Sequence, residues 1–290
     1  MTSTTQRLPS LKPAVPQFKA RVMDIAPFII VHLALFGVIW TGVKASDFVL
    51  FGVIYTVQML AVTVGYHRYF SHKTFKTGRV FQFILAFLAQ STAQKGALWW
   101  AAHHRDHHKY SDTEKDVHSP ITRSFLYSHV GWIFDIRNDP TKFSKIRDFA
   151  RFRELRFLNR FQLLPAFVMG WVVLQFFGAS GLIVGFLGSI VLCWHVTFMI
   201  NSLAHVWGTR PYETDDQSRN NVFLALLSCG EGWHNNHHND MLDARLGTHW
   251  WQIDLGWYTI WALSKVGIVS SPRRRTFHRK AKPSIALGAN

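Results

Sequence analysis

Residues 99–112 read W-W-A-A-H-H-R-D-H-H-K-Y-S-D, which places four histidines within six consecutive positions. In a helix, His104, His107 and His108 share one face, because residues three and four apart are neighbours on a helix surface. Imidazole nitrogens that converge from one face suit iron, zinc or copper. Taken alone, the stretch is also open to a cationic or pH-sensing cluster on a solvated surface.

Two further histidine clusters favour the metal interpretation. Residues 234–238, H-N-N-H-H, repeat the same spacing, and residues 67–72, H-R-Y-F-S-H, add another pair. Together with one single histidine they make a set of nine that we expect on one face of the protein: His67, His72, His104, His107, His108, His205, His234, His237 and His238. Three separated clusters therefore predict a metal centre.

The composition indicates a membrane protein. The chain has 290 residues, of which 48% are hydrophobic and 15% aromatic, and 32 Lys and Arg against 17 Asp and Glu give a formal charge of +15. Because the apolar residues fall in long runs, the basic residues are better explained by anionic lipid than by nucleic acid. No nucleic-acid reader motif is recognisable. Cys193 and Cys229 have neither metal-motif spacing nor the pattern of a disulfide framework.

Four apolar runs are long enough to cross a bilayer as helices, at residues 26–43, 48–66, 161–177 and 181–203. The basic run from Lys142 to Arg160 marks the cytoplasmic side, whereas the turn at 178–180 carries no charge. The sequence therefore predicts an all-α integral membrane protein of one domain, residues 1–290, with four spans in two hairpins. Residues 67–160 and 204–290 would form a cytosolic helical cap, and both termini would be cytoplasmic.

Four remaining segments are assigned by position. Residues 81–100 are predicted to lie against the membrane, because a further crossing would separate His104 from His67 by ~30 Å of hydrocarbon. Residues 249–266 have the aromatic pattern of an interfacial helix, and Arg273–Arg275 are expected to contact anionic lipid. His195, inside the fourth predicted span, is interpreted as a packing or hydrogen-bonding residue.

Nine imidazoles are too many for one tetrahedral zinc ion, which takes four ligands. They fit two metals with four or five nitrogen ligands each, and a structural zinc site would usually add thiolates. Two neighbouring redox metals beside a membrane indicate oxygen activation on an apolar substrate, with iron the leading candidate. Metal-bound histidines need carboxylates that fix their tautomers. We expect Glu231 and Asp112 in this role ahead of the other nearby carboxylates, Asp106, Asp116 and Asp240.

The motifs H-R-Y-F-S-H (67–72), H-R-D-H-H-K-Y-S-D (104–112) and H-N-N-H-H (234–238) resemble the three histidine boxes of the integral-membrane fatty acyl desaturases. Flanking sequences, such as N-S-L-A-H at 201–205 and G-E-G-W-H at 230–234, resemble the stearoyl-CoA and bacterial Δ9 branch. The resemblance extends from about Tyr66 to His238. It implies a non-haem di-iron centre held by the nine histidines, with Asn201 holding a metal-bound water.

The resemblance also implies an O₂-dependent enzyme that introduces a cis double bond, at Δ9, into a saturated acyl chain. By position, Gln94, Trp100 and Thr197 would line the substrate tunnel, and Trp132 and Arg137 would lie near the acyl head group. The acyl carrier is CoA or a membrane lipid. Electrons would come from a separate ferredoxin-like or cytochrome-type donor with its reductase, and the basic cytosolic surface, especially Arg147 to Arg160, would suit an acidic donor.

The resemblance favours a bacterial inner membrane as the location, with the active site on the cytoplasmic side. Two alternatives stay open at this stage. One is a membrane di-iron hydroxylase that places oxygen on an alkyl or acyl chain, since its sequence requirements are the same. The other is a non-catalytic metal- or lipid-binding membrane scaffold, which would tolerate the loss of a single box histidine.

Overall fold

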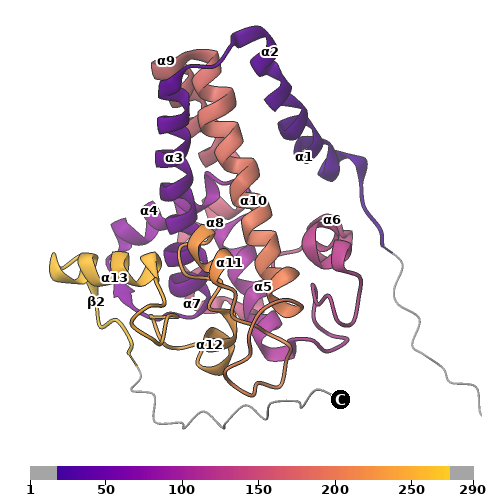
Figure 1. Cartoon of the computed structure of the whole chain (residues 1–290), viewed down its shortest axis with the longest axis vertical. Helices are drawn as coiled ribbons and strands as arrows, with labels where there is room; N and C mark the ends of the chain where they lie inside the picture. The colour runs from indigo at the N-terminus through magenta and orange to yellow at the C-terminus, as the bar shows by residue number, and fades with distance from the viewer. Residues whose placement is uncertain (1–17, 275–290) are drawn as a thin grey trace, which may run out of the picture.

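The computed structural model describes residues 18–274, and its architecture is almost entirely helical (Figure 1). Long helices form the upper part of the molecule, and shorter helices and loops gather below them. The described strands, β1 (Lys76–Thr77) and β2 (Val269–Ser270), form one short antiparallel ladder. The predicted all-α class is confirmed.

Within residues 18–274, three helical runs are long and apolar enough to cross a membrane: Val22–Thr41, Ala45–Ser71 and Leu164–His205. The first consists of α1 (Val22–Ala34), η1 (Leu35–Gly37) and α2 (Val38–Thr41). The second joins α3 (Ala45–Leu60) to the π-helix η2 (Ala61–Ser71). These two runs contain most of the first two predicted spans.

The third run reverses direction at Gly178. It comprises α9 (Leu164–Ser180), the π-helix η6 (Gly181–Leu187) and α10 (Gly188–Asn201), followed by η7 (Leu203–His205). A straight helix of its 42 residues would be ~63 Å long, about twice the hydrocarbon thickness. Gly178 has φ +72°, which breaks the helix at a residue without a Cβ. A Cβ on Gly170 would lie 3.0 Å from the Phe186 ring, so the two arms pack against each other.

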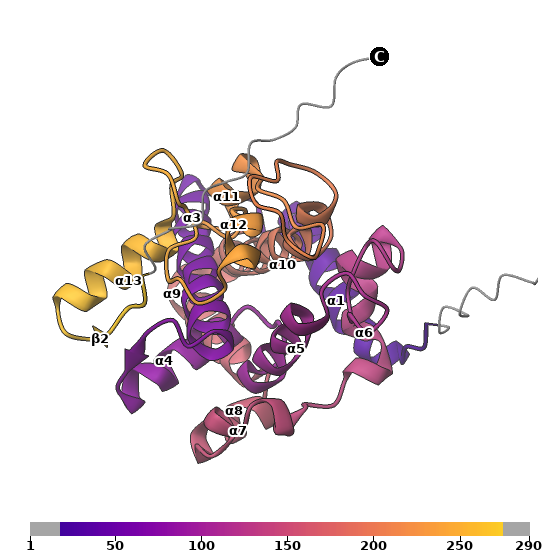
Figure 2. The same ribbon diagram turned by 90° about the horizontal axis from the view of Figure 1, so that it is seen from below.

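The lower part of the molecule is built from short helices, seen from below in Figure 2. In chain order these are α4 (Arg79–Gln90), α5 (Ala97–Tyr110), η3 (Tyr127–Gly131), α6 (Trp132–Phe134), η4 (Ile136–Asn138), η5 (Phe143–Lys145), α7 (Arg147–Ala150), α8 (Arg153–Arg160), α11 (Val222–Leu227), α12 (His234–Asn239) and α13 (Leu255–Lys265).

Two helices in this part differ from their predicted bounds. The helix expected over 81–100 is split into α4 and α5, because Ala93 and Lys95 have positive φ values of 55° and 68°. With 12 residues, α4 is ~18 Å long and too short to cross a bilayer. The helix expected from residue 249 begins only at Leu255, because the Asp254 carboxylate caps it by accepting a hydrogen bond from the Trp257 N–H.

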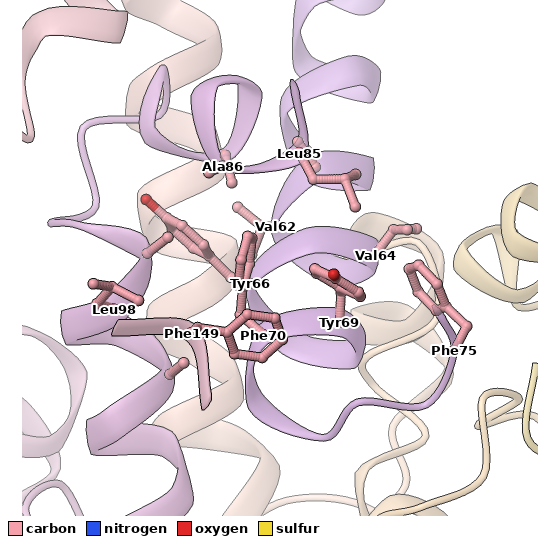
Figure 3. Packing of buried hydrophobic residues seen from close by; sticks show 14 of the residues in the cluster. Val62, Val64, Tyr66, Tyr69, Phe70, Phe75, Leu85, Ala86, Leu98 and Phe149 are labelled. Atoms are coloured by element: carbon pink, nitrogen blue, oxygen red, sulfur yellow. The ribbon is translucent and has the colours of Figure 1, made fainter. Parts of the chain in front are cut away.

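The core is an aromatic cluster around η2, in which every residue is buried. Tyr69 stacks on Phe75 with ring centroids 5.1 Å apart and lies 5.2 Å from the Phe149 ring (Figure 3). A Cβ on Gly65 would lie 3.3 Å from the Leu85 carbonyl oxygen, so α4 approaches the η2 backbone closely there. This packing fixes the helix that carries the first histidine box.

The basic segment at 273–275 falls partly outside the described residues, which exclude Arg275. Arg274 does not simply face lipid, because its Nε lies 3.4 Å from an Asp243 oxygen and its guanidinium lies 4.8 Å from the Trp257 ring centre. Arg273 is exposed. Arg274 is itself 43% exposed, so the expected lipid contact of this segment stays a prediction.

Candidate metal centre

The π-helix η2 brings the first two histidines together. In an α-helix, His67 and His72 would point about 140° apart, because five residues exceed one turn of 3.6 residues. In the π-helical register, the His72 N–H donates to the His67 carbonyl oxygen at 3.2 Å, the i→i+5 bond of this helix type. The two imidazole centroids then lie 4.8 Å apart.

The nine predicted histidines gather in two groups. Within each group, the candidate ligand nitrogens lie within 4.8 Å of one another. The five-imidazole cluster contains His67, His72, His104, His108 and His237. The four-imidazole cluster contains His107, His205, His234 and His238. A third group adds Asp116 and His118 around His107.

Helices α5 and α12 each contribute histidines to both clusters, and both helices divide them in the same way. From α5, His104 and His108 enter the five-imidazole cluster, while His107 enters the other. From α12, His234 and His238 share the four-imidazole cluster, while His237 joins the other. The expectation that all three histidines of one helix face converge on one point was therefore wrong. Residues four apart diverge by about 40° around a helix, whereas the residue at i+3 lies about 60° to the other side.

The nitrogen contacts fit metal ligation. In the five-imidazole cluster, Nε2 atoms of His67 and His237, of His72 and His104, and of His108 and His237 are each 2.9 Å apart. His67 also directs Nδ1 at a Glu231 oxygen 2.5 Å away. A neutral imidazole carries one N–H, so a proton on that Nδ1 leaves the Nε2 lone pair facing its neighbours. Converging lone pairs of this kind could hold a metal cation, and imidazole nitrogens suit iron and zinc.

Burial keeps most of these imidazoles neutral, which is the form that binds metals. Burial and the neighbouring imidazoles lower the pKa of His104, His108 and His237 well below the ordinary value. Burial also lowers the pKa of His238 to about 4, although Asp216 opposes this shift. His107 differs: burial disfavours its cation, but the Asp116 carboxylate raises its pKa.

Four carboxylates each contact the Nδ1 atom of one clustered histidine. The two predicted ones are Glu231, at His67, and Asp112, whose oxygen accepts from the His205 Nδ1–H at 2.9 Å. Asp116 lies 3.0 Å from the Nδ1 of His107, and Asp216 lies 2.5 Å from that of His238. Such partners fix the tautomer and orientation of metal-binding histidines. Asp106 instead pairs with Lys142 and Lys145.

Asp216 was missed by the sequence reasoning. It lies in the polar segment between His205 and α11, where no helical or box spacing links it to His238. Its other oxygen accepts hydrogen bonds from the Ser218 N–H and the Thr214 hydroxyl, at 3.0 Å and 2.9 Å. These bonds shape the loop so that the carboxylate faces the cluster. Only the folded loop brings this residue to the site.

Asp216→Asn is expected to weaken iron binding about 10- to 100-fold, the usual cost of losing a partner behind a metal ligand. The amide can keep the bonds to Ser218 and Thr214, but its NH₂ group would face the Nδ1–H of His238. Iron retention would be measured by titration with a competing chelator. The matched control is the exposed neighbour Asp215→Asn, and equal affinities for the two variants would contradict the assigned role.

An apolar cavity of about 580 Å³ reaches the five-imidazole cluster at His104. The predicted tunnel residues Gln94, Trp100 and Thr197 all line it, and the Gln94 amide donates to the Thr197 hydroxyl at 3.3 Å. Trp100 stacks on His104 with ring centroids 4.8 Å apart. Asn201 lines both this cavity and a smaller one of about 30 Å³ bordered by His67, His107 and His234.

The two residues expected near the head group behave differently. Trp132 lines the cavity and stacks on Trp99 at 5.4 Å. Arg137 is outside the cavity lining, and its Nε donates to an Asp135 oxygen at 2.8 Å. The positive charge expected from Arg137 is therefore already paired, because the η4 turn brings the guanidinium back to a carboxylate two residues earlier.

Two of the histidines left out of the predicted set, His103 and His195, have partners away from the clusters. His103 lies next to Trp99 and hydrogen-bonds its carbonyl oxygen at 2.9 Å, away from both clusters. His195 contacts His32 on α1 and His129 on η3, each at 3.1 Å. The interpretation of His195 as a hydrogen-bonding residue agrees with these contacts.

Comparison with known proteins places this geometry in context. The fatty acid desaturase family model matches residues 46–267. Delta-9 acyl-lipid desaturase 1 of Arabidopsis thaliana is 36% identical over 241 residues, covering 82% of this chain and 77% of that protein. The acyl-CoA C20 Delta5-desaturase of Anemone leveillei is 35% identical, with 83% and 78% coverage. The chloroplastic palmitoyl-monogalactosyldiacylglycerol delta-7 desaturase of Arabidopsis thaliana is 33% identical, with 87% and 68% coverage.

Proposed function

Because the chain belongs to the fatty acid desaturase family, we propose that it introduces a cis double bond, at Δ9, into a saturated acyl chain carried by CoA or by a membrane lipid. The observation that carries this proposal is the meeting of the apolar cavity with the imidazole clusters at His104 and Asn201. An apolar chain in this cavity would pass directly beside the metal ligands.

The proposed cofactor is a pair of iron ions, one in each imidazole cluster. Iron bound there would supply the redox chemistry by which O₂, with two external electrons, can oxidise an unactivated C–H bond. Asn201 would orient a water ligand from the cavity side. The four carboxylates, Asp112, Asp116, Asp216 and Glu231, would keep the ligating nitrogens unprotonated and correctly aimed.

The overall reaction is R–CH₂–CH₂–R′ + O₂ + 2 e⁻ + 2 H⁺ → R–CH=CH–R′ + 2 H₂O. The contribution of the protein is to position one methylene pair and to keep bulk water away. Trp100 would serve as the wall beside the reacting carbons, because it stacks on both His104 and Tyr66. Gln94 and Thr197, which also line the cavity, would fix the bend of the chain.

The proposed topology has four membrane spans, because the third apolar run is folded back at Gly178. The clusters, the cap (67–160 and 204–290) and both termini would then lie on the cytoplasmic side, as one domain. Support comes from the exposed arginines at positions 147, 151, 153, 156 and 160. The same surface would attract an acidic, separate electron donor such as a ferredoxin or a cytochrome.

The test is expression in a host that cannot make its own monounsaturated fatty acids, together with a ferredoxin and its reductase. Cis-Δ9 monoenes are expected in the host lipids, with the bond position read by mass spectrometry. The purified protein should hold about two iron ions per chain by elemental analysis. Hydroxylated chains in place of monoenes would contradict the desaturase assignment, and iron-free protein that still makes monoenes would contradict the proposed cofactor.

A further inference from the structure

Helix α1 forms one wall of the cavity but is only loosely packed. None of its 13 residues is buried. Even so, five residues of this helix line the cavity: Met23, Asp24, Pro27, Phe28 and Val31. Figure 1 shows α1 joining the other long helices at the top through α2 and diverging from α10 below.

One aromatic side chain and a few polar contacts hold α1 in place. Phe28 stacks on Trp194 of α10 with ring centroids 5.1 Å apart, and His32 Nε2 lies 3.1 Å from His195 Nε2 on the same helix. At the lower end, Arg21 pairs with Asp139 at 2.8 Å. This wall is thus attached mainly through these side chains, while no residue of α1 is buried.

Helix α9 forms the other flank of the cavity. Ala166, Phe167 and Trp171 line the cavity, and Phe167 and Trp171 are 71% and 62% exposed. Side chains that line the cavity and are also exposed leave a single side-chain layer between the cavity and the outer surface of α9. This helix belongs to a run long and apolar enough to cross a membrane, so that outer surface would face hydrocarbon.

The charges at the cavity are balanced. Among the lining residues that the structure describes, Asp24 and Lys95 are the charged side chains apart from histidine. Lys95 pairs with Asp139 at 3.1 Å, and Arg21 pairs with both Asp24 and Asp139. Arg137, nearby in sequence, is paired with Asp135. The phosphates of CoA would be bound best by unpaired lysine or arginine, and the described lining residues include none.

From these observations we propose that the acyl chain enters sideways from the bilayer, between α1 and α9, while esterified to a membrane glycerolipid with an uncharged or zwitterionic head group. This inference rests on the proposed function and names its substrate class. The head group stays at the membrane surface near Met23, Asp24 and Leu163, where both flanking helices begin. The chain passes between Phe28 and Phe167 toward His104.

The test uses the full-length, iron-loaded protein in nanodiscs of phosphatidylcholine. A trace phosphatidylcholine with a diazirine at mid-chain is photolysed, and crosslinked peptides are mapped by mass spectrometry. Crosslinks are expected on α1 and α9, and excess stearoyl-CoA should not remove them. Crosslinks absent from both helices, or abolished by stearoyl-CoA, would overturn the lateral entrance.

Turnover is measured in the same nanodiscs with deuterated distearoyl-phosphatidylcholine or deuterated stearoyl-CoA, plus reduced ferredoxin. Label is expected in intact monounsaturated phosphatidylcholine. Conversion of the CoA thioester in preference to the lipid would refute the proposed carrier. If the crosslinks form but neither substrate is converted, the desaturase function is refuted while the lateral entrance remains supported. The failure of the function and the failure of the entrance therefore give different results.

A matched pair of variants tests the route. Ala166→Phe adds bulk at a lining position of α9, and Val168→Phe adds similar bulk two residues away, outside the cavity lining. Crosslinking and lipid turnover are expected to fall at least tenfold in Ala166→Phe and to stay within twofold of the parent in Val168→Phe. Equal effects of the two substitutions would count against entry between α1 and α9.

Discussion

His107→Ala is expected to lower product formation by more than about 100-fold, to below detection. Losing a partner behind a metal ligand already costs 10- to 100-fold, and His107 is itself one of the four nitrogens in its cluster. The substitution also leaves the buried Asp116 carboxylate without its imidazole partner 3.0 Å away. Iron content should fall to one ion per chain or less.

The measurement combines gas chromatography of host fatty acids with elemental analysis of the purified variant. The control is His249→Ala, which removes an exposed histidine outside both clusters and should leave activity and iron unchanged. His107→Ala should still insert in the membrane at the level of the unsubstituted protein. Monoene production by His107→Ala above one tenth of the parent would refute the assignment of this cluster as a catalytic metal site.

Arg68→Leu is expected to destabilise the protein by about 3–5 kcal/mol, the usual cost of leaving a buried charge uncompensated. Arg68 is 1% exposed, and its Nη2 lies 2.8 Å from Asp254 and 3.2 Å from Glu231. Its Nη1 donates to the Ala244 carbonyl oxygen at 2.8 Å. Without the guanidinium, two buried carboxylates would repel each other, and Glu231 would no longer be held against His67.

Thermal unfolding in detergent, followed by tryptophan fluorescence, would measure the loss. Arg79→Leu is the control, because its pair with Glu154 involves a guanidinium that is 65% exposed and solvent screens such pairs. Arg68→Lys should fall between the two, since an ammonium keeps the charge but lacks the planar fork. Similar unfolding temperatures for Arg68→Leu and Arg79→Leu would contradict the buried network.

The sequence was informative wherever function follows helical periodicity. The apolar runs predicted the long helices, and the i, i+3, i+4 spacing placed the α5 and α12 histidines on faces directed toward the site. It did not reveal how each face divides between two clusters, because that depends on the position of the opposing helix. The pairing of His67 with His72 was visible only as a motif, since α-helical geometry would separate them.

Other parts of the site depend on loops whose shape no local pattern specifies. Asp216 reaches His238 across 22 residues of sequence, and Asp254 reaches Arg68 across 186. The split of the helix expected at 81–100 depends on positive φ at Ala93 and Lys95, residues that rarely adopt this conformation. Such features arise from tertiary packing, which overrides the local preference of the chain.

The shared use of α5 and α12 by both imidazole clusters has a consequence for assembly. An ion bound in one cluster would restrain both helices, and would thereby lower the entropic cost of positioning the ligands of the other cluster. Loading should therefore be cooperative, with the half-filled protein scarce at intermediate iron concentrations. The protein would then change from the metal-free to the fully metal-loaded form over a narrow range of iron concentration. Few molecules would carry a single ion able to react with oxygen unproductively.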